Sequence, residues 1–215
     1  MNSKEEDKEI TIKILTLGES TVGKSCIIRR YTEDKFALNF LTTIGVDFKS
    51  KYIDYKKFRV KVLLIDTSGQ EKYRIIASNY YRSTDGILFV FDVSNRHSVE
   101  KMDYWIKQIQ EKTSIATNCI LAFGNKTDLK DERQVSMEEA QELAKKYNLD
   151  YKEGSALSGV GINETVELLV DNIIKERELV DEHGNLKEKK EEEIVVKKKL
   201  KPIKDKSGKG KKCCK

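Results

Sequence analysis

The stretch Gly18-Glu-Ser-Thr-Val-Gly-Lys-Ser25 constrains the fold of this chain more than any other part of the sequence. It matches G-x-x-x-x-G-K-[ST], the pattern of a P-loop, in which backbone N–H groups surround a phosphate. The apolar, β-branched run 10–17 before it predicts a buried strand, and residues 25–31 have helical spacing. Taken alone, the pattern leaves open an ordinary turn before a helix.

The residue types in this loop suit a phosphate. Gly18 and Gly23 allow a tight turn in which successive N–H groups face one concavity. The N-terminus of the following helix favours negative charge. Lys24 adds a positive charge for the outer phosphates, and the Ser25 hydroxyl is a ligand that suits Mg²⁺.

Strands and helices alternate along the chain up to about residue 179. We expect strands at 46–55, 58–65, 86–93, 118–123 and 150–152, and helices at 98–112, 136–147 and 162–179. The alternation predicts an α/β fold with a mostly parallel sheet and helices on both faces. The short connection after residue 55 favours an antiparallel hairpin, although it contains no glycine. Ligands of such sheets bind beyond the carboxyl ends of the strands.

The charge is distributed unevenly. The chain carries a net charge of +5, and residues 195–215, with ten Lys and one Asp, contribute +9, which leaves −4 for the rest. We therefore expect a polar, flexible lead at 1–9, a globular domain at 10–179, and a disordered lysine-rich tail at 180–215. The tail contains no aromatic residue, which argues against a nucleic-acid-binding surface.

Further observations concern membrane or targeting segments, the cysteines and the single tryptophan. No apolar run is long enough to span a membrane, and the polar N-terminus does not resemble a signal or transit peptide. Cys26 and Cys119 fall in predicted core elements, whereas Cys213 and Cys214 end the lysine-rich tail. Trp105 lies on the apolar face of the helix predicted at 98–112, where we expect core packing.

A second group of residues could complete a phosphate and Mg²⁺ site. Thr43 lies in the long loop 32–45, and Asp66-x-x-Gly69 follows a predicted strand. We expect Ser25 and Thr43 to bind Mg²⁺ directly and Asp66 to bind it through water. Gly69 supplies an N–H near the outer phosphate, and the Gln70 side chain after it can orient a water for attack.

A third group predicts selection of a base. Asn125-Lys-Thr-Asp128 follows an apolar strand about a hundred residues after the P-loop. The Asp128 carboxylate can accept from guanine N1–H and the 2-amino group, a donor pair that adenine lacks. The Lys126 stem can cover the base, Asn125 can tie neighbouring loops together, and Ser155-Ala156 can donate a backbone N–H to guanine O6.

With these residues the chain resembles the Rab family, a branch of the Ras-like small G proteins. Thr43-Ile-Gly-Val-Asp-Phe48 resembles the Rab switch I signature, Tyr80-Tyr-Arg82 the element after switch II, and residues 88–94 a further family element. The likeness implies a six-stranded sheet with one antiparallel edge strand, and switches at about 36–46 and 66–80. It also implies a membrane-anchored GTP/GDP switch in vesicle trafficking, with slow GTP hydrolysis that an activating protein accelerates.

The resemblance also implies where the nucleotide lies, with Phe36 against the guanine ring. The implied contacts are Gly18, Glu19, Ser20, Thr21, Val22, Gly23, Lys24, Ser25, Cys26, Phe36, Thr43, Gly69, Asn125, Lys126, Asp128, Ser155, Ala156 and Leu157, with Gln70 and Lys24 as the catalytic residues.

Some residues depart from the family pattern. Ile65 replaces the Trp of an aromatic effector triad that also contains Phe48 and Tyr80, which puts effector binding of the usual kind in doubt. Leu157 replaces a Lys that packs near the base, so nucleotide affinity is expected to be somewhat lower. Ser68 leaves the Asp66 and Gly69 requirements intact.

The C-terminus, Cys213-Cys214-Lys215, resembles tails that receive two geranylgeranyl groups. Two lipid chains give stable attachment, and the upstream lysines attract an acidic leaflet. The likeness implies a monomer at the cytoplasmic face of an intracellular or plasma membrane, with a cytosolic pool. Its implied partners are an exchange factor, a GTPase-activating protein, effectors, a prenylation escort and a GDP-dissociation inhibitor.

Two alternatives stay open from the sequence. One is a weakly hydrolysing or non-hydrolysing scaffold that holds GTP or GDP only to fold and recruit partners, for which Ile65, Ser68 and Leu157 leave room. The other is a different P-loop enzyme, such as a nucleotide or metabolite kinase, against which the segment 125–128 and Gln70 argue.

Overall fold

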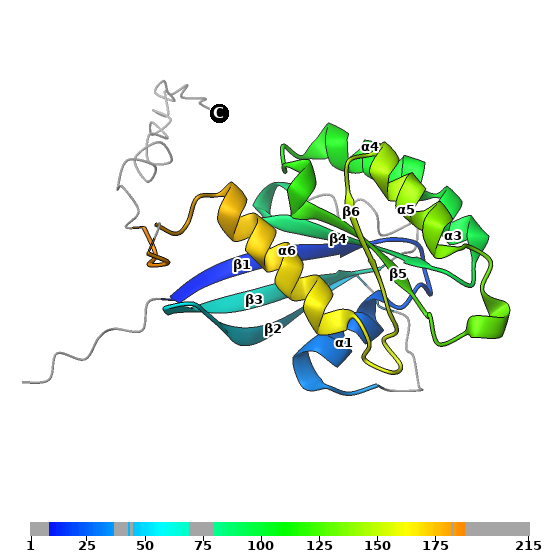
Figure 1. The fold of residues 1–215 in the computed structure, drawn as a ribbon, viewed down its shortest axis with the longest axis horizontal. Coiled ribbons are helices and arrows are strands. Elements are labelled where there is room, and N and C mark those ends of the chain that lie inside the picture. Colours follow the sequence, from blue (N-terminus) through cyan, green and yellow to red (C-terminus); the bar gives the residue numbers. More distant parts are fainter. Residues whose placement is uncertain (1–8, 37–42, 44, 69–79, 182, 188–215) are drawn as a thin grey trace, which may run out of the picture.

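The computed structural model describes residues 9–36, 43, 45–68, 80–181 and 183–187. Its centre is a six-stranded sheet in the order β2-β3-β1-β4-β5-β6 (Figure 1). The strands are β1 (Glu9–Leu17), β2 (Val46–Tyr55), β3 (Phe58–Thr67), β4 (Gly86–Asp92), β5 (Ile120–Asn125) and β6 (Asp150–Glu153).

All neighbouring strands are parallel except β2 and β3, which form an antiparallel hairpin at one edge. The predicted fold class, including its one antiparallel edge strand, is therefore confirmed. The turn between β2 and β3 contains no glycine, and Lys56 adopts a positive φ of 51° there. Lys56 thus takes the left-handed conformation that glycine usually supplies in such turns.

Helices cover both faces of the sheet (Figure 1). Helices α1 (Lys24–Glu33) and α6 (Ile162–Glu176) enclose one apolar core, and α3 (Arg96–Glu100), α4 (Met102–Lys112) and α5 (Met137–Lys146) enclose a second one on the other face. The central strand β4 is buried along its whole length. Its apolar run therefore contributes side chains to both cores, as is usual for strands of a parallel sheet.

The helix predicted at 98–112 is two helices in the structure, α3 and α4, which meet at Lys101. The Asn95 side chain accepts from the backbone N–H of His97 and starts α3 earlier than hydrophobic spacing indicated. The helix expected from residue 136 is α5, and Ser136 caps it, because its Oγ accepts from the backbone N–H of Glu139 at 3.1 Å.

The chain after α6 differs from the predicted disordered tail, which was expected to begin at residue 180. Val180 pairs with Leu186 in an antiparallel bridge, and the Lys187 N–H donates to the Leu179 carbonyl. The Asp181 carboxylate accepts from the backbone N–H groups of His183 and Asn185, which closes the turn. Residues 179–181 and 183–187 are called the C-terminal hairpin below.

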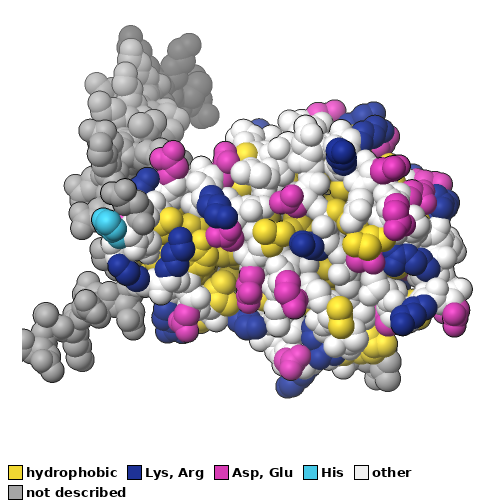
Figure 2. Space-filling model, viewed as in Figure 1, with side chains coloured by type: hydrophobic (Ala, Val, Ile, Leu, Met, Phe, Trp, Pro, Cys, Tyr) yellow, Lys and Arg dark blue, Asp and Glu magenta, His cyan; other side chains and the backbone are white. Residues whose placement is uncertain are grey.

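The C-terminal hairpin packs against the first core through Leu179, Val180 and Leu186. At its tip, Gly184 has a positive φ of 76° and lies against the side chain of Lys56 in the β2–β3 turn. Figure 2 shows hydrophobic side chains gathered near this end of the molecule, among charged ones. Three apolar side chains in a mostly polar segment were too few to reveal this packing in the sequence.

Replacing Leu186 by Ala removes part of this contact. We expect the free energy of unfolding to fall by about 1 kcal/mol, since a partly buried Leu loses some of its apolar contact area. Denaturation in urea measures this change, with Lys187→Ala as the matched control on an exposed neighbour. A Leu186→Ala protein as stable as the control would show that the hairpin contributes nothing to the fold.

Candidate functional site

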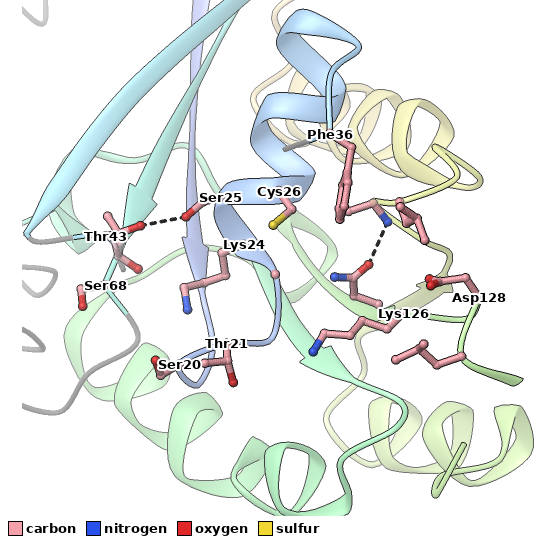
Figure 3. Close-up of a pocket in the computed structure, with 16 residues that line it drawn as sticks. Ser20, Thr21, Lys24, Ser25, Cys26, Phe36, Thr43, Ser68, Lys126 and Asp128 are labelled. Carbon is pink, nitrogen blue, oxygen red and sulfur yellow. Dashed lines mark hydrogen bonds between the residues drawn. The ribbon is translucent and has the colours of Figure 1, made fainter. Parts of the chain in front are cut away.

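A cavity of about 530 Å³ opens at the carboxyl ends of the strands. Figure 3 shows residues of the P-loop at one end of it and Phe36, Lys126 and Asp128 at the other. The lining residues come from five loops and helix ends that lie far apart in sequence: Ser20, Thr21, Gly23, Lys24, Ser25, Cys26, Phe36, Thr43, Thr67, Ser68, Asn125, Lys126, Asp128, Leu129, Ala156 and Leu157. Pockets of this size are typical of small-molecule sites.

The two predicted P-loop glycines are required by the backbone geometry. Gly18 has a φ of 139°, and a Cβ there would lie 2.0 Å from the Val90 carbonyl oxygen. Gly23 has a φ of 97°, and a Cβ there would lie 2.3 Å from the Asn125 amide nitrogen. Any side chain at either position would push the loop away from β4 or β5.

The residues between the glycines have different surroundings. Thr21 is exposed and has a φ of 65°, an uncommon conformation for a β-branched residue. Such outliers gather at ligand sites, where surrounding structure holds them in place. Val22 is buried in the first core, so its side chain anchors the loop, whereas Ser20 lies at the cavity.

Lys24 is buried, and its ammonium donates to the carbonyl oxygens of Gly18 at 2.9 Å and Glu19 at 2.7 Å. Burial lowers the pKa of Lys24 to about 8, against the opposing effect of the Asp66 and Glu19 carboxylates. The site thus holds an ammonium in a place that disfavours the charge, and an anionic ligand would offset this cost.

Ser25, Thr43 and Asp66 lie together, although they come from three separate segments. The Ser25 and Thr43 hydroxyl oxygens are 2.8 Å apart, and the Thr43 hydroxyl donates to Asp66 Oδ2 at 3.3 Å (Figure 3). Asp66 Oδ1 is buried and has no hydrogen-bond partner among the described residues. Burial raises the pKa of Asp66, while the neighbouring hydroxyls of Ser25 and Thr43 and the charge of Lys24 oppose this shift.

These three oxygen-bearing side chains suit Mg²⁺, a hard cation that prefers oxygen ligands. A cation would satisfy the unpaired Asp66 Oδ1, which makes the donor set fit the ion.

Cys26 also lines the cavity, but burial raises the pKa of its thiol to about 11. The thiol is therefore neutral near pH 7 and contributes no charge to the cavity.

Asn125 connects the two ends of the cavity. It is buried at the end of β5, and its amide nitrogen donates to the Val22 carbonyl of the P-loop at 2.8 Å. Its amide oxygen accepts from the backbone N–H of Ala156 at 3.1 Å. One side chain thus fixes the P-loop relative to the loop that follows β6.

Lys126 and Asp128 lie on the far side of the cavity from Lys24. Lys126 has a φ of 70°, and its ammonium is 2.6 Å from the carboxylate of Asp92 at the end of β4. This ion pair fixes the Lys126 stem along the cavity wall. Asp128 is exposed at the edge of the cavity, and Phe36 packs partly against the first core (Figure 3).

The loop 155–158 is closed by its own hydrogen bonds. Ser155 is buried, and its hydroxyl accepts from the backbone N–H groups of Leu157 and Ser158. The Ser155 and Ala156 N–H groups, expected to face a base oxygen, donate instead to Val160 and Asn125. A base oxygen would have to share the Ala156 N–H with Asn125.

Several predicted residues lie outside the described part of the chain. These are Gly69, Gln70, Cys213 and Cys214.

The structure describes all three positions of the aromatic effector triad, which are 48, 65 and 80. Phe48 is exposed and meets Tyr80 edge to face at 5.6 Å between ring centroids, while Ile65 is buried beside them in the second core.

Sequence reasoning missed three residues that shape the site. Asp92 holds Lys126, and Arg30 on α1 donates to the carbonyls of Ala156 and Leu157. Trp105 on α4 donates from its indole nitrogen to the Glu19 carboxylate. Each pairing joins distant segments, so no local pattern could reveal it; only the position of Asp92 at a strand end was a signal.

Comparison with known proteins agrees with this arrangement. The Ras family model matches residues 13–175. The chain is 38% identical to rat Ras-related protein Rab-27A, over 80% of this chain and 82% of the relative, and 38% identical to human Rab-27B, over 80% and 84%. It is 40% identical to the GTP-binding protein ypt2 of Schizosaccharomyces pombe, over 77% and 82%. The chain therefore belongs to the Ras family and is a Rab-family small GTPase.

Proposed function

We propose that this GTPase is a GTP/GDP switch that binds its nucleotide in the 530 Å³ cavity. The phosphates occupy the end formed by residues 18–25, and the guanine base occupies the end formed by Lys126, Asp128 and Leu157. The observation that carries this assignment is the pair of Asn125 hydrogen bonds, which fixes both ends of the cavity relative to each other.

The base end favours guanine over adenine. A carboxylate at Asp128 accepts from two adjacent donors, which guanine presents and adenine does not. Adenine would leave this carboxylate without its partners, at a cost typical of an unmade charged hydrogen bond. The Lys126 stem, held by Asp92, and the Phe36 ring cover the two faces of the base.

The phosphate end supplies charge and oxygen ligands. Lys24 neutralises the outer phosphates, and its hydrogen bonds to the carbonyls of Gly18 and Glu19 hold its ammonium at this end of the cavity. Ser25 and Thr43 would hold Mg²⁺, with Asp66 beside them, and the ion would supply charge for the leaving phosphate.

Hydrolysis is assigned to a water that Gln70 orients toward the outer phosphate. Lys24 stabilises the charge that develops there. Arg30, which lies near the cavity, is engaged with the carbonyls of Ala156 and Leu157. A slow intrinsic rate, raised by a partner that adds positive charge, follows from this arrangement.

The switch acts on the segments that follow Phe36 and Asp66. Contacts of the outer phosphate with Thr43 and Gly69 order these segments, and hydrolysis releases them. Effectors read the result at the surface that includes Phe48 and Tyr80. Because position 65 holds Ile, which has no ring, this surface offers two rings instead of three, and its effectors therefore fit a smaller aromatic patch.

Attachment to a membrane is assigned to the tail. In the described residues, no helix has the length and apolar character needed to cross a bilayer. Lipid groups on Cys213 and Cys214, with the ten lysines of residues 195–215, would anchor the chain for a role in vesicle trafficking. Mass spectrometry of the C-terminal peptide from native cells tests the anchor, and unmodified cysteines there would reject it.

Replacing Asp128 by Ala tests the base site. We expect affinity for GDP to fall roughly ten- to hundredfold, with much less change for ADP, because the carboxylate recognises guanine donors. Competition of GDP and ADP against a fluorescent GDP analogue measures both affinities. Asp131→Ala, which removes a nearby exposed carboxylate, is the control, and equal losses in the two variants would reject the assignment.

The buried ammonium predicts a pH dependence. Since the pKa of Lys24 in the free protein is about 8, the ammonium is present below this pH and lost above it. Phosphates favour the charged form, so binding takes up a proton above pH 8. The affinity for GDP should then fall by up to about tenfold per pH unit above 8 and stay flat below it.

Titration of binding between pH 7 and 9 measures this dependence. Lys24→Met is the control, because it lacks the ammonium but leaves ionisation of the base unchanged. The same slope in both proteins would show that the effect does not come from Lys24.

Replacing Gln70 by Leu tests hydrolysis separately from binding. We expect the rate of GTP hydrolysis to fall at least about tenfold with GDP affinity unchanged, because the variant loses only the group that orients water. Phosphate release in a single turnover measures the rate. Gln110→Leu, on the exposed side of α4, should hydrolyse as the native chain does; normal turnover by Gln70→Leu would refute the role.

A further inference from the structure

A hydrogen bond joins helix α4 to the P-loop. The indole nitrogen of Trp105 donates to the Glu19 carboxylate at 2.9 Å, across 86 positions of sequence. Trp105 is 3% exposed and packs in the second core with Met102, Ile106 and Ile109. The expected core packing is confirmed, and the indole N–H has an additional polar role that spacing could not reveal.

The backbone of Glu19 contacts the Lys24 ammonium. Glu19 follows Gly18 directly, and its carbonyl oxygen accepts from the Lys24 ammonium at 2.7 Å. The orientation of this peptide therefore helps to set where the ammonium lies. A side chain that is held at its carboxylate restricts rotation of the backbone to which it is attached.

The remaining loop is held from the other side. Gly18 lies against the Val90 carbonyl of β4, and the Val22 carbonyl accepts from Asn125 of β5. These contacts fix the loop to the sheet. The Trp105 hydrogen bond fixes it to the helix layer, so the loop is held by both layers of the domain.

Helix α4 is a firm support for this contact. Its apolar face, which includes Trp105, is fully packed, so the indole N–H is presented from a side chain that has already lost its rotational freedom. A donor that is ordered in advance loses little further entropy when it binds a carboxylate. Hydrogen bonds to a charged acceptor are also stronger than neutral ones.

We infer that Trp105 is a positioning residue for the nucleotide site, and that it holds Glu19 so that the P-loop keeps its phosphate-binding shape. The inference rests on the proposed function, because it takes GDP as the ligand of the loop. Without the indole N–H, the loop samples other shapes, and GDP leaves faster. Trp105 is not among the residues that line the proposed cavity, and it acts through Glu19.

Replacement of Trp105 by Phe keeps an aromatic ring in the core and removes the donor. We expect the rate of GDP dissociation in Mg²⁺ buffer to rise roughly three- to tenfold, as expected for loss of a hydrogen bond to a charged group. Tyr55→Phe is the matched control. It removes another aromatic donor to a carboxylate, Asp171 on α6, at the opposite end of the domain.

Variants of Glu19 test the same bond from its other partner and do not disturb the core. Glu19→Gln keeps an acceptor, and Glu19→Leu removes it, so GDP dissociation should rank native, then Gln, then Leu. Since Trp105 is the only Trp in the chain, its fluorescence also reports the contact. The emission of the nucleotide-free Leu variant should differ from that of the native protein.

The double variant Trp105→Phe with Glu19→Leu decides whether the two residues act together. If they act through one hydrogen bond, the double variant releases GDP no faster than Glu19→Leu alone. Fully additive effects, or Trp105→Phe and Tyr55→Phe proteins with the same dissociation rate, would overturn the inference. If Trp105→Phe does not fold, the Glu19 ranking and the emission change decide the question.

Failure of this inference is distinct from failure of the proposed function. A native chain that does not bind GDP in preference to ADP would reject the proposed function before any variant is made. A native chain that binds GDP, together with a Glu19→Leu variant that releases it at the native rate, would reject only the role of Trp105.

Discussion

The site depends above all on the buried amide of Asn125. It is the side chain that is bonded both to the P-loop and to the loop after β6, and it lies at the end of a strand that is buried on both faces. Loss of either bond would leave a buried polar group unpaired and separate the two ends of the cavity. The sheet thus fixes the distance between phosphate and base sites through one residue, and the surrounding helices keep that strand in place.

Much of the fold was predictable from local patterns. Apolar runs predicted six strands, and their alternation with helices predicted a mostly parallel sheet with ligand residues at one edge. The tight turn at Gly18 and Gly23 was predicted because glycine tolerates such a backbone. The structure adds a second reason, since a side chain at either position would collide with Val90 or Asn125. Asn125 was also expected to connect loops, and the structure shows which ones.

The remaining features depend on pairings between distant segments, which leave no periodic trace. The ion pair of Lys126 with Asp92 and the hydrogen bond of Trp105 with Glu19 each join residues that lie far apart in the sequence. The break at Lys101 depends on one Asn95 cap, and the C-terminal hairpin depends on an Asp181 carboxylate in a charged segment. Composition predicted disorder from residue 180 because it averages over such single contacts.

The C-terminal hairpin changes the geometry of a membrane tether. It meets Lys56 at the sheet edge where the parallel strands begin, opposite the edge that holds the nucleotide cavity. A tether that starts after Lys187 instead of at Val180 is shorter by up to about 28 Å in contour length, at about 3.5 Å per residue. In a lipid-anchored chain, the tether would therefore leave the domain on the side opposite the nucleotide cavity and would be shorter, which raises the local concentration that a neighbouring membrane-bound partner meets.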